Sequence, residues 1–143
     1  MGRPLVVVAN VIYDKQGRFL VGMHKDGNKE NLYAFPGGKV EHETCEQAWW
    51  RELREETALK KPDFDIKLEY LGMHEVGFKE KRFLILFYAA PYYAEKMGKP
   101  KTLEKDKHYE WEWLTLEQLV TKPLASSTVE FVNKMYPRWK GYQ

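Results

Sequence analysis

Hydrophobic positions come in short runs along this chain, and their spacing predicts strands first and a helix afterwards. Residues 5–13 are apolar and rich in β-branched side chains, which is typical of a buried strand. A turn at residues 14–17 leads into a second strand over residues 18–24, so the two form a hairpin. A polar loop over residues 25–31 and a short strand over residues 32–35 follow, and the short strand enters a Gly-Gly turn.

A helix is predicted from Thr44 to about Thr57. Thr44 with Gln47 three residues later fits a capping box, and the apolar stripe of the helix is Ala48, Trp49 and Leu53, with Cys45 as a possible fourth member. Trp49 and Trp50 are adjacent and point about 100° apart on a helix. We therefore expect one of the two indole rings to be partly exposed, to sit under a loop or to lie at a dimer contact.

The second half of the chain predicts further strands and two helical segments. Residues 66–76 and 82–90 are expected to be strands, and the latter is apolar on both faces and therefore central. Residues 93–108 predict a mobile surface loop. Residues 110–114 predict a strand, residues 116–120 and 128–135 predict helices, and Pro137 is expected to end the last one. This order indicates an α/β fold, an α/β/α sandwich with a mixed β-sheet in a single domain over residues 1–143.

Composition and charge exclude several classes of protein. The chain has 143 residues, 43% of them hydrophobic, and a formal net charge of +2, which argues against disorder and against a stable nucleic-acid partner. No apolar run approaches the roughly 20 residues of a membrane span, so no membrane partner is expected. The single cysteine, Cys45, excludes an intrachain disulfide and suits a reducing, cytoplasmic location.

Residues 41–56 carry an unusual concentration of carboxylates, six glutamates against two arginines. On the predicted helix Glu52, Glu55 and Glu56 stand at i, i+3 and i+4, so the three share one face. Like charges at this spacing repel and weaken a helix. A bound hard divalent cation is the simplest compensation, because such ions prefer carboxylate oxygens.

The same region resembles the box of the Nudix hydrolase family, G-x5-E-x7-R-E-U-x-E-E-x-G-U with U aliphatic. Residues 35–41, 43–44 and 51–59 read FPGGKVE, ET and RELREETAL. The sequence departs from the family twice: only four residues separate Gly38 from Glu43, where a Gly usually precedes that Glu, and Ala58 replaces the second box glycine. The preceding strands and the late WEWL strand are also similar to those of the family.

This resemblance implies a Nudix-type sandwich and hydrolysis of a nucleoside diphosphate linked to another moiety, with Mg²⁺ as the metal and Mn²⁺ as a substitute. The implied metal ligands are Glu52, Glu55, Glu56 and the carbonyl of Gly37. One box glutamate is implied as the general base, and Glu52 is preferred. Arg51 is implied to orient the carboxylates through hydrogen bonds to Glu55 and Glu43. Late-loop acids supply a base or ligand in some members, which here indicates Glu104 or Asp106.

Further residues are candidates for contact with the nucleotide substrate. Phe35 and Asn10 are expected beside the base, with the Asn10 amide reading its edge. His24, Gly38 and Lys39 lie on or next to the Gly-Gly turn and are candidates for contact with base or phosphate. The four histidines are spread along the chain without an HxxxH pair, so each is expected to be a surface or strand residue rather than a catalyst: His24, His42, His74 and His108.

Sequence features that distinguish subgroups of the family reduce the number of candidate substrate classes. The runs typical of members that act on NADH, ADP-ribose and dinucleoside polyphosphates are absent, which leaves the MutT-like pyrophosphatases. The expected reaction is hydrolysis of a nucleoside triphosphate, a dNTP or an oxidised dNTP, to nucleoside monophosphate and pyrophosphate. Two alternatives stay open: a diphosphatase for a nucleoside-diphosphate sugar, dinucleotide or RNA cap, and a non-catalytic nucleotide-binding module. The surplus of aromatic residues makes a homodimer conceivable.

Overall fold

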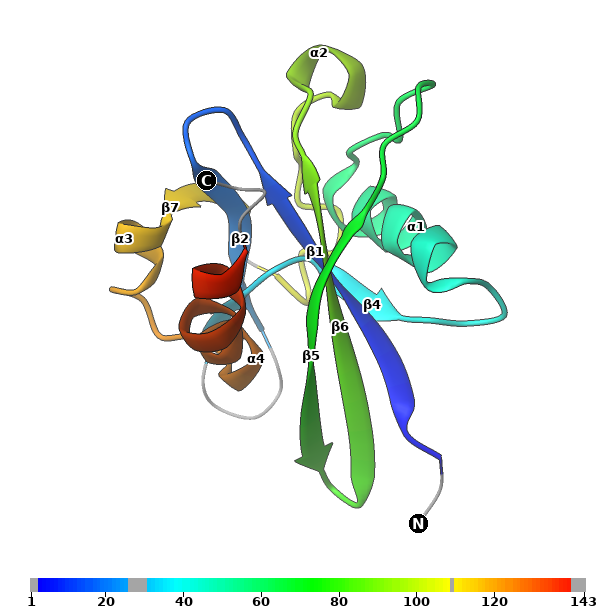
Figure 1. The fold of residues 1–143 in the computed structure, drawn as a ribbon, viewed down its shortest axis with the longest axis vertical. Coiled ribbons are helices and arrows are strands. Elements are labelled where there is room, and N and C mark those ends of the chain that lie inside the picture. The colour runs from blue at the N-terminus through cyan, green and yellow to red at the C-terminus, as the bar shows by residue number, and fades with distance from the viewer. Residues whose placement is uncertain (1–2, 26–30, 109, 140–143) are drawn as a thin grey trace.

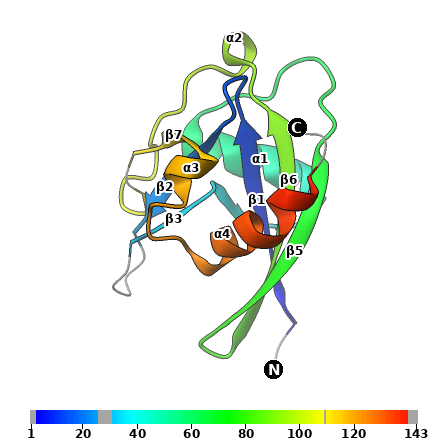
Figure 2. The ribbon, with the colours of Figure 1, turned by 60° about the vertical axis from the view of Figure 1, so that its left-hand side comes forward.

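The structure of the chain is a computed structural model that describes residues 3–25, 31–108 and 110–139. A seven-stranded mixed sheet lies between helix α1 on one face and helix α4 on the other (Figures 1 and 2), which confirms the predicted α/β/α sandwich. The loop predicted for residues 25–31 lies largely outside the described residues. The elements are β1 (Leu5–Tyr13), β2 (Arg18–His24), β3 (Leu32–Ala34), β4 (Gly37–Lys39), α1 (Cys45–Thr57), β5 (Glu69–Phe78), β6 (Lys81–Pro91), α2 (Ala94–Met97), β7 (Glu112–Thr115), α3 (Leu116–Leu119) and α4 (Ser126–Glu130).

Strands β1 and β6 form the parallel centre of the sheet, paired from Leu5 opposite Phe83 to Tyr13 opposite Pro91. The β1–β2 hairpin is antiparallel as predicted, and β3 and β7 both pair with β2. Strand β5 pairs with the edge of β6 opposite to β1. Strand β6 is therefore central, as predicted for residues 82–90. The strand predicted from residue 66 begins at Glu69.

Alternating side chains of β1 supply two separate hydrophobic cores, one for each face of the sheet. Val8 and Ile12 pack toward α1, in a core that includes Trp49 and Leu53. Ala9 and Val11 face the other way, in a core covered by the C-terminal helical segment. The period-2 alternation of a strand therefore fixes both layers of the sandwich from one stretch of sequence.

Helix α1 begins and docks as its sequence predicts. Thr44 and Gln47 form the predicted capping box, because each side chain accepts a hydrogen bond from the backbone N–H of the other. The Trp49 indole reaches the sheet and donates to the carbonyls of Ala9 at 3.2 Å and Tyr88 at 3.0 Å. Since these carbonyls belong to β1 and β6, one side chain fixes the helix over the centre of the sheet.

Of the alternatives predicted for Trp49 and Trp50, partial exposure is excluded, because both are buried, at 0% and 7% exposure, and the structure agrees with cover by a loop. The Trp50 ring packs edge-on against Trp49 with centroids 4.7 Å apart, and the Lys61 ammonium lies 5.8 Å from its centroid. Leu59 and Ile66, from the segment after the helix, belong to the same core. This segment covers a wider arc of α1 than the apolar stripe alone indicates.

Three local predictions also differ from the structure. The predicted Gly-Gly turn is strand β4, paired with β1; a Cβ on Gly37 would lie 2.1 Å from the Val8 carbonyl oxygen, so glycine permits this close approach. The predicted loop over residues 93–108 contains α2, whose Met97 is fully buried. Pro137 does not end the last helix, because α4 continues through a π-helical segment (Phe131–Met135) into a 3-10 turn (Tyr136–Arg138) that contains this proline.

None of the helices in the described part of the chain combines the length and the apolar character that crossing a membrane requires.

The capping box gives a direct test of how α1 begins. Thr44→Ala removes the hydroxyl that accepts the Gln47 N–H, and we expect the free energy of unfolding to fall by about 1 kcal/mol. Thr44→Ser keeps the hydroxyl and is the matched control, with a much smaller loss. Urea unfolding of the three proteins measures both values. Equal stability of wild type and Thr44→Ala would show that the cap does not stabilise the helix.

Candidate metal and nucleotide site

The three helix carboxylates differ in how deeply they lie. The Glu56 side chain is 8% exposed and that of Glu52 is 14% exposed, whereas that of Glu55 is 45% exposed. The face predicted from their spacing therefore runs from solvent at Glu55 to the interior at Glu56. Buried carboxylates need compensating partners, because an isolated charge is costly to remove from water.

Arg51 is the centre of the hydrogen bonds that hold this face. Its guanidinium donates to Glu43 Oε1 from Nη2 at 2.6 Å and from Nε at 3.0 Å, and Nε also donates to Oε2 at 3.1 Å. Nη1 donates to Glu55 at 2.9 Å and lies 3.4 Å from Glu52 Oε2. These charge-assisted bonds lower the pKa of Glu43. The structure thus places Arg51 on both of the glutamates predicted from the sequence, Glu55 and Glu43.

The short box loop still delivers Glu43 to Arg51. Five residues separate Gly37 from Glu43, so the box spacing is met when it is counted from Gly37 rather than from Gly38. The loop turns tightly where the Glu43 N–H donates to the Glu41 carbonyl at 2.9 Å. Arg51 Nη2 also donates to the carbonyl of Lys39, the last residue of β4, at 2.9 Å. The loop is therefore tied to α1 from both of its ends.

Strand β4 lies directly against the two deeper carboxylates. The Gly37 N–H donates to Glu56 Oε1 at 2.8 Å. A Cβ on Gly38 would lie 2.0 Å from Glu52 Oε2, so only a glycine leaves room for this carboxylate. Ligation of a metal by the Gly37 carbonyl and by the helix glutamates stays a prediction.

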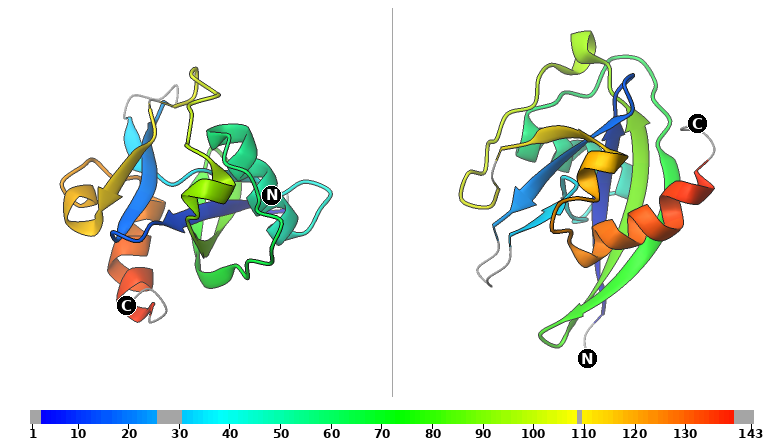
Figure 3. Two further views of the ribbon diagram at one scale, coloured as in Figure 1. Left: turned by 90° about the horizontal axis from the view of Figure 1, so that it is seen from above. Right: turned by 90° about the vertical axis from the view of Figure 1, so that its left-hand side faces the viewer.

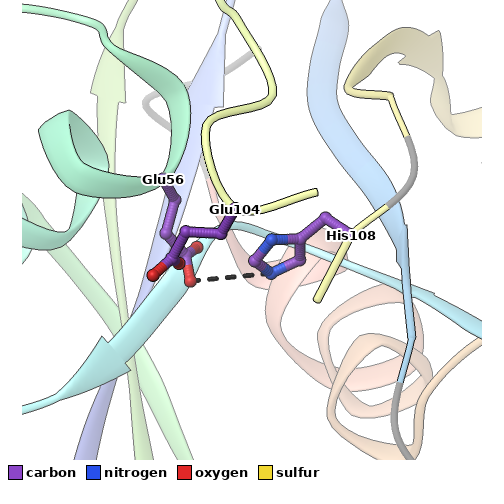
Figure 4. A group of neighbouring side chains, drawn as sticks. All are labelled: Glu56, Glu104 and His108. Atoms are coloured by element: carbon purple, nitrogen blue, oxygen red, sulfur yellow. Dashed lines mark ion pairs between the residues drawn. The ribbon is translucent and has the colours of Figure 1, made fainter. Parts of the chain in front are cut away.

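A late segment of the chain reaches the same place, where it follows α2 and runs beside β2 (Figure 3). Glu56, Glu104 and His108 point toward one another (Figure 4), and their ligand atoms all lie within 4.8 Å of one another. His108 is 3% exposed, and its Nε2 lies 3.6 Å from Glu56 Oε2. Glu104 is thus one of the two acids expected from this segment, whereas Asp106 is exposed and outside the group.

His108 is the residue that sequence reasoning missed, because it was expected to be a surface or strand histidine. Its ring packs against His24 with centroids 4.6 Å apart and against Trp111 at 4.8 Å. Trp111 Nε1 donates to the Glu56 carbonyl at 3.1 Å, so the late segment holds both the backbone and the carboxylate of that residue. The available signal was the four-residue spacing from Glu104 to His108, which is too common to identify a site.

Burial sets the charge state of this group. It raises the pKa of Glu52 to about 7, against the opposing effect of Arg51. It raises the pKa of Glu56 to about 8, although the Gly37 N–H and Lys107 act in the other direction. Burial also lowers the pKa of His108. The carboxylate oxygens of Glu56 and Glu104 are donors that fit a hard divalent cation, and the cation would favour the ionised carboxylates.

A pocket of about 360 Å³ adjoins the carboxylates on the side of β4. Gly37 and Gly38 belong both to its wall and to the contacts with Glu56 and Glu52. His24 and Phe35, two of the residues predicted to contact the nucleotide, also line it. Lys39 is exposed, and it joins the site through its carbonyl bond to Arg51. A volume of this size is in the range of small-molecule sites.

The predicted role of Asn10 in reading the base is contradicted by the structure. Asn10 is 0% exposed, and its amide nitrogen donates to the Trp49 carbonyl at 2.9 Å. Like Val8 and Ile12, it stands on the face of β1 that packs toward α1, and it is not among the residues that line the pocket. Asn10 joins the central strand to the helix that carries the carboxylates.

The raised pKa values predict how stability depends on pH in the metal-free protein. Because Glu52 and Glu56 titrate near 7 and 8 when folded, above the ordinary value near 4.5, the folded state binds more protons than the unfolded state. Stability should therefore fall as pH rises from about 6.5 to about 8. The lowered pKa of His108 has the opposite sign, but its effect is complete near the unfolded value of 6.5.

Urea unfolding in EDTA across this pH window measures the slope, and Glu56→Gln should flatten it. Glu46→Gln, an exposed residue in the first turn of α1, is the matched control and should leave the slope unchanged. Stability that rises over the window in the wild-type protein would contradict the buried, proton-binding state of these carboxylates.

Known proteins are similar to this chain in sequence and in architecture. Residues 3–135 match the NUDIX domain. The chain is 42% identical over 66 residues to YtkD of Bacillus subtilis (strain 168), provisionally named an 8-oxo-dGTP diphosphatase; the match covers 46% of this chain and only 37% of that protein. The structure is similar to that of a MutT NUDIX hydrolase from Burkholderia pseudomallei, with a TM-score of 0.79, 24% identity and coverage of 93% of this chain and 98% of that one.

The E. coli ORF135 protein is also similar, with a TM-score of 0.74, 26% identity and coverage of 91% of this chain and 86% of that one. The match to the family extends over nearly all of the described residues, and it includes the carboxylate helix, β4 and the late segment that holds Glu104 and His108. The resemblance predicted from residues 35–59 is thereby confirmed, and the chain belongs to the NUDIX domain family.

Proposed function

We propose that this chain hydrolyses a nucleoside triphosphate to nucleoside monophosphate and pyrophosphate, with Mg²⁺ as the metal and Mn²⁺ as a substitute. The observation that carries the proposal is the shared wall formed by Gly37 and Gly38. These residues line a pocket of about 360 Å³ on one side and contact the carboxylates of Glu56 and Glu52 on the other. A nucleoside in the pocket would therefore extend its phosphates over the carboxylates.

The carboxylates would have different roles when water attacks the phosphate chain. Glu52 is proposed as the general base, because a pKa of about 7 suits proton transfer near neutral pH. Arg51 lies 3.4 Å from its Oε2 and would fix its orientation, while Glu55 is held by the same guanidinium. The water oxygen would bond to one phosphorus of an anhydride, its proton would pass to Glu52, and the bridging oxygen would leave with the other phosphorus.

The ligand atoms of Glu56, Glu104 and His108 lie within 4.8 Å of one another, and Glu52 and Glu55, on the same helix as Glu56, are proposed as further ligands of a hard cation. When bound, Mg²⁺ would neutralise phosphate charge and make a bound water more acidic. The Gly37 N–H and the Trp111 indole would hold Glu56 in place during the reaction. Glu104, on the late segment, is proposed as an additional ligand or acid.

An oxidised dNTP is the proposed substrate, and the likeness to YtkD supports this choice. The pocket offers aromatic and apolar contact from Phe35 and Phe87, with His24 and Ser127 as polar groups at its wall. A cytoplasmic location and a homodimer remain proposals; the single cysteine supports the first, and exposed apolar side chains such as Tyr70 and Met73 on β5 support the second.

A hydrolysis panel tests the reaction. It would compare dGTP, 8-oxo-dGTP, ADP-ribose, a diadenosine polyphosphate and capped RNA, with Mg²⁺ or EDTA and with identification of phosphate or pyrophosphate. We expect pyrophosphate from 8-oxo-dGTP and complete loss of activity in EDTA. Activity confined to the linked substrates would replace the proposal with the diphosphatase alternative. Tight nucleotide binding without hydrolysis would indicate a binding module.

Glu52→Gln tests the proposed base. It removes the proton acceptor while keeping the shape of the side chain, and we expect turnover to fall by about 100-fold to 10,000-fold. Glu46→Gln makes the same chemical change on the same helix outside the cluster and should keep wild-type turnover. A Glu52→Gln enzyme with near-normal turnover would assign the base to another group, with Glu104 the next candidate.

Substitution of the two glycines of β4 should affect different properties, catalysis for Gly38 and stability for Gly37. In Gly38→Ala the new methyl group would displace the flexible Glu52 carboxylate, so turnover should fall by about 100-fold while stability is largely kept. In Gly37→Ala the methyl group meets the Val8 backbone oxygen, so unfolding should occur at lower urea concentration. Full activity of Gly38→Ala would show that the position of Glu52 against β4 is unimportant.

A further inference from the structure

A second and larger hollow, of about 900 Å³, lies on the other side of the carboxylates. Its charged lining is mostly basic, with Lys25, Lys101 and Lys105, and Glu110 is the acidic residue among those that line it. His108 and Trp111 form the wall nearest to Glu56. Neither the family resemblance nor the sequence patterns assign these lysines a role.

The backbone that carries the lysines is fixed to the rest of the site. The Lys25 ammonium donates to the Lys105 carbonyl at 2.8 Å, and the Lys25 N–H donates to the Lys107 carbonyl at 2.6 Å. The Lys101 N–H donates to the carbonyl of Thr57, at the end of α1, at 2.7 Å. The basic hollow is thus held between β2 and the carboxylate helix and does not depend on side chains alone.

Glu56 lies between the two hollows. Its Oε1 accepts the N–H of Gly37, which lines the smaller pocket, and its Oε2 lies 3.6 Å from Nε2 of His108, which lines the larger one. His24 and Lys25 are consecutive, yet His24 lines the smaller pocket and Lys25 the larger. An apolar pocket, a carboxylate cluster and a basic hollow therefore follow one another across the site.

We propose that the basic hollow binds the distal phosphates of the nucleoside triphosphate and, after cleavage, the pyrophosphate product. This inference rests on the proposed function, because it assigns the far end of the same substrate. Lysine ammonium groups bind phosphate as compact point charges, and three of them would offset the charge that pyrophosphate gains when the bridging bond breaks. They also favour triphosphates over substrates whose distal part is uncharged.

The double variant Lys101→Gln/Lys105→Gln tests the assignment. The Lys105 carbonyl that holds Lys25 is unchanged, so the hollow should keep its shape. Calorimetric titration with inorganic pyrophosphate and Mg²⁺ should show binding weakened by about tenfold or more, as expected for loss of two charge-assisted contacts. Binding of dGMP should stay within about twofold of wild type, because its base and single phosphate would lie on the other side of Glu56.

Lys67→Gln/Lys96→Gln is the matched control, since it removes two exposed lysines that do not line this hollow. Pyrophosphate affinity that is unchanged in the first variant, or reduced equally in both variants, would overturn the assignment. The readout is independent of turnover. If pyrophosphate binding depends on the lysines but the protein cleaves no triphosphate, the proposed reaction is refuted and the phosphate site stands. If the protein cleaves triphosphates but pyrophosphate binding does not depend on the lysines, the proposed reaction stands and the phosphate site is refuted.

Discussion

The Arg51 guanidinium holds together a helix face that its own charges would otherwise weaken. Its Nε and Nη2 donate to Glu43, Nη1 donates to Glu55, and Nη2 also donates to the Lys39 carbonyl. Like charges at i and i+3 weaken a helix, and the guanidinium lies against both Glu52 and Glu55. The same contacts tie the loop after β4 to α1, and with the pairing of β4 to β1 they place the glycines against Glu52 and Glu56.

The three carboxylates differ in burial within the sandwich, and the pKa of the two buried ones is raised. Glu55 stays near solvent, whereas Glu52 and Glu56 lie between α1 and β4, where burial raises their pKa to about 7 and about 8. The helix can hold them there because Trp49 bonds the carbonyls of two central strands. Docking of the helix by Trp49 therefore buries the carboxylates of Glu52 and Glu56, which is unfavourable for their charged forms. A bound cation would offset this cost.

Sequence alone identified the parts of this site that lie in one continuous segment. The bounds of β1, β2 and α1, the capping box and the Arg51 contacts all follow from local patterns between residues 5 and 59. His108 was missed because its role depends on a tertiary approach of the late segment to Glu56. Asn10 was misplaced because strand alternation turns it toward α1. For Trp50, cover by a loop was one of the predicted alternatives, and the structure shows that the segment with Leu59 and Ile66 provides it.

We propose that the buried carboxylates of α1 bind a divalent cation. Calorimetric titration of the metal-free protein with Mg²⁺ at about pH 7, in buffers of different ionisation enthalpy, measures both the binding and the protons released by it. Because Glu52 and Glu56 are partly protonated at this pH without metal, binding should release protons, and Glu56→Gln should reduce the release. Binding without proton release, or no binding at all, would contradict a metal site at these carboxylates.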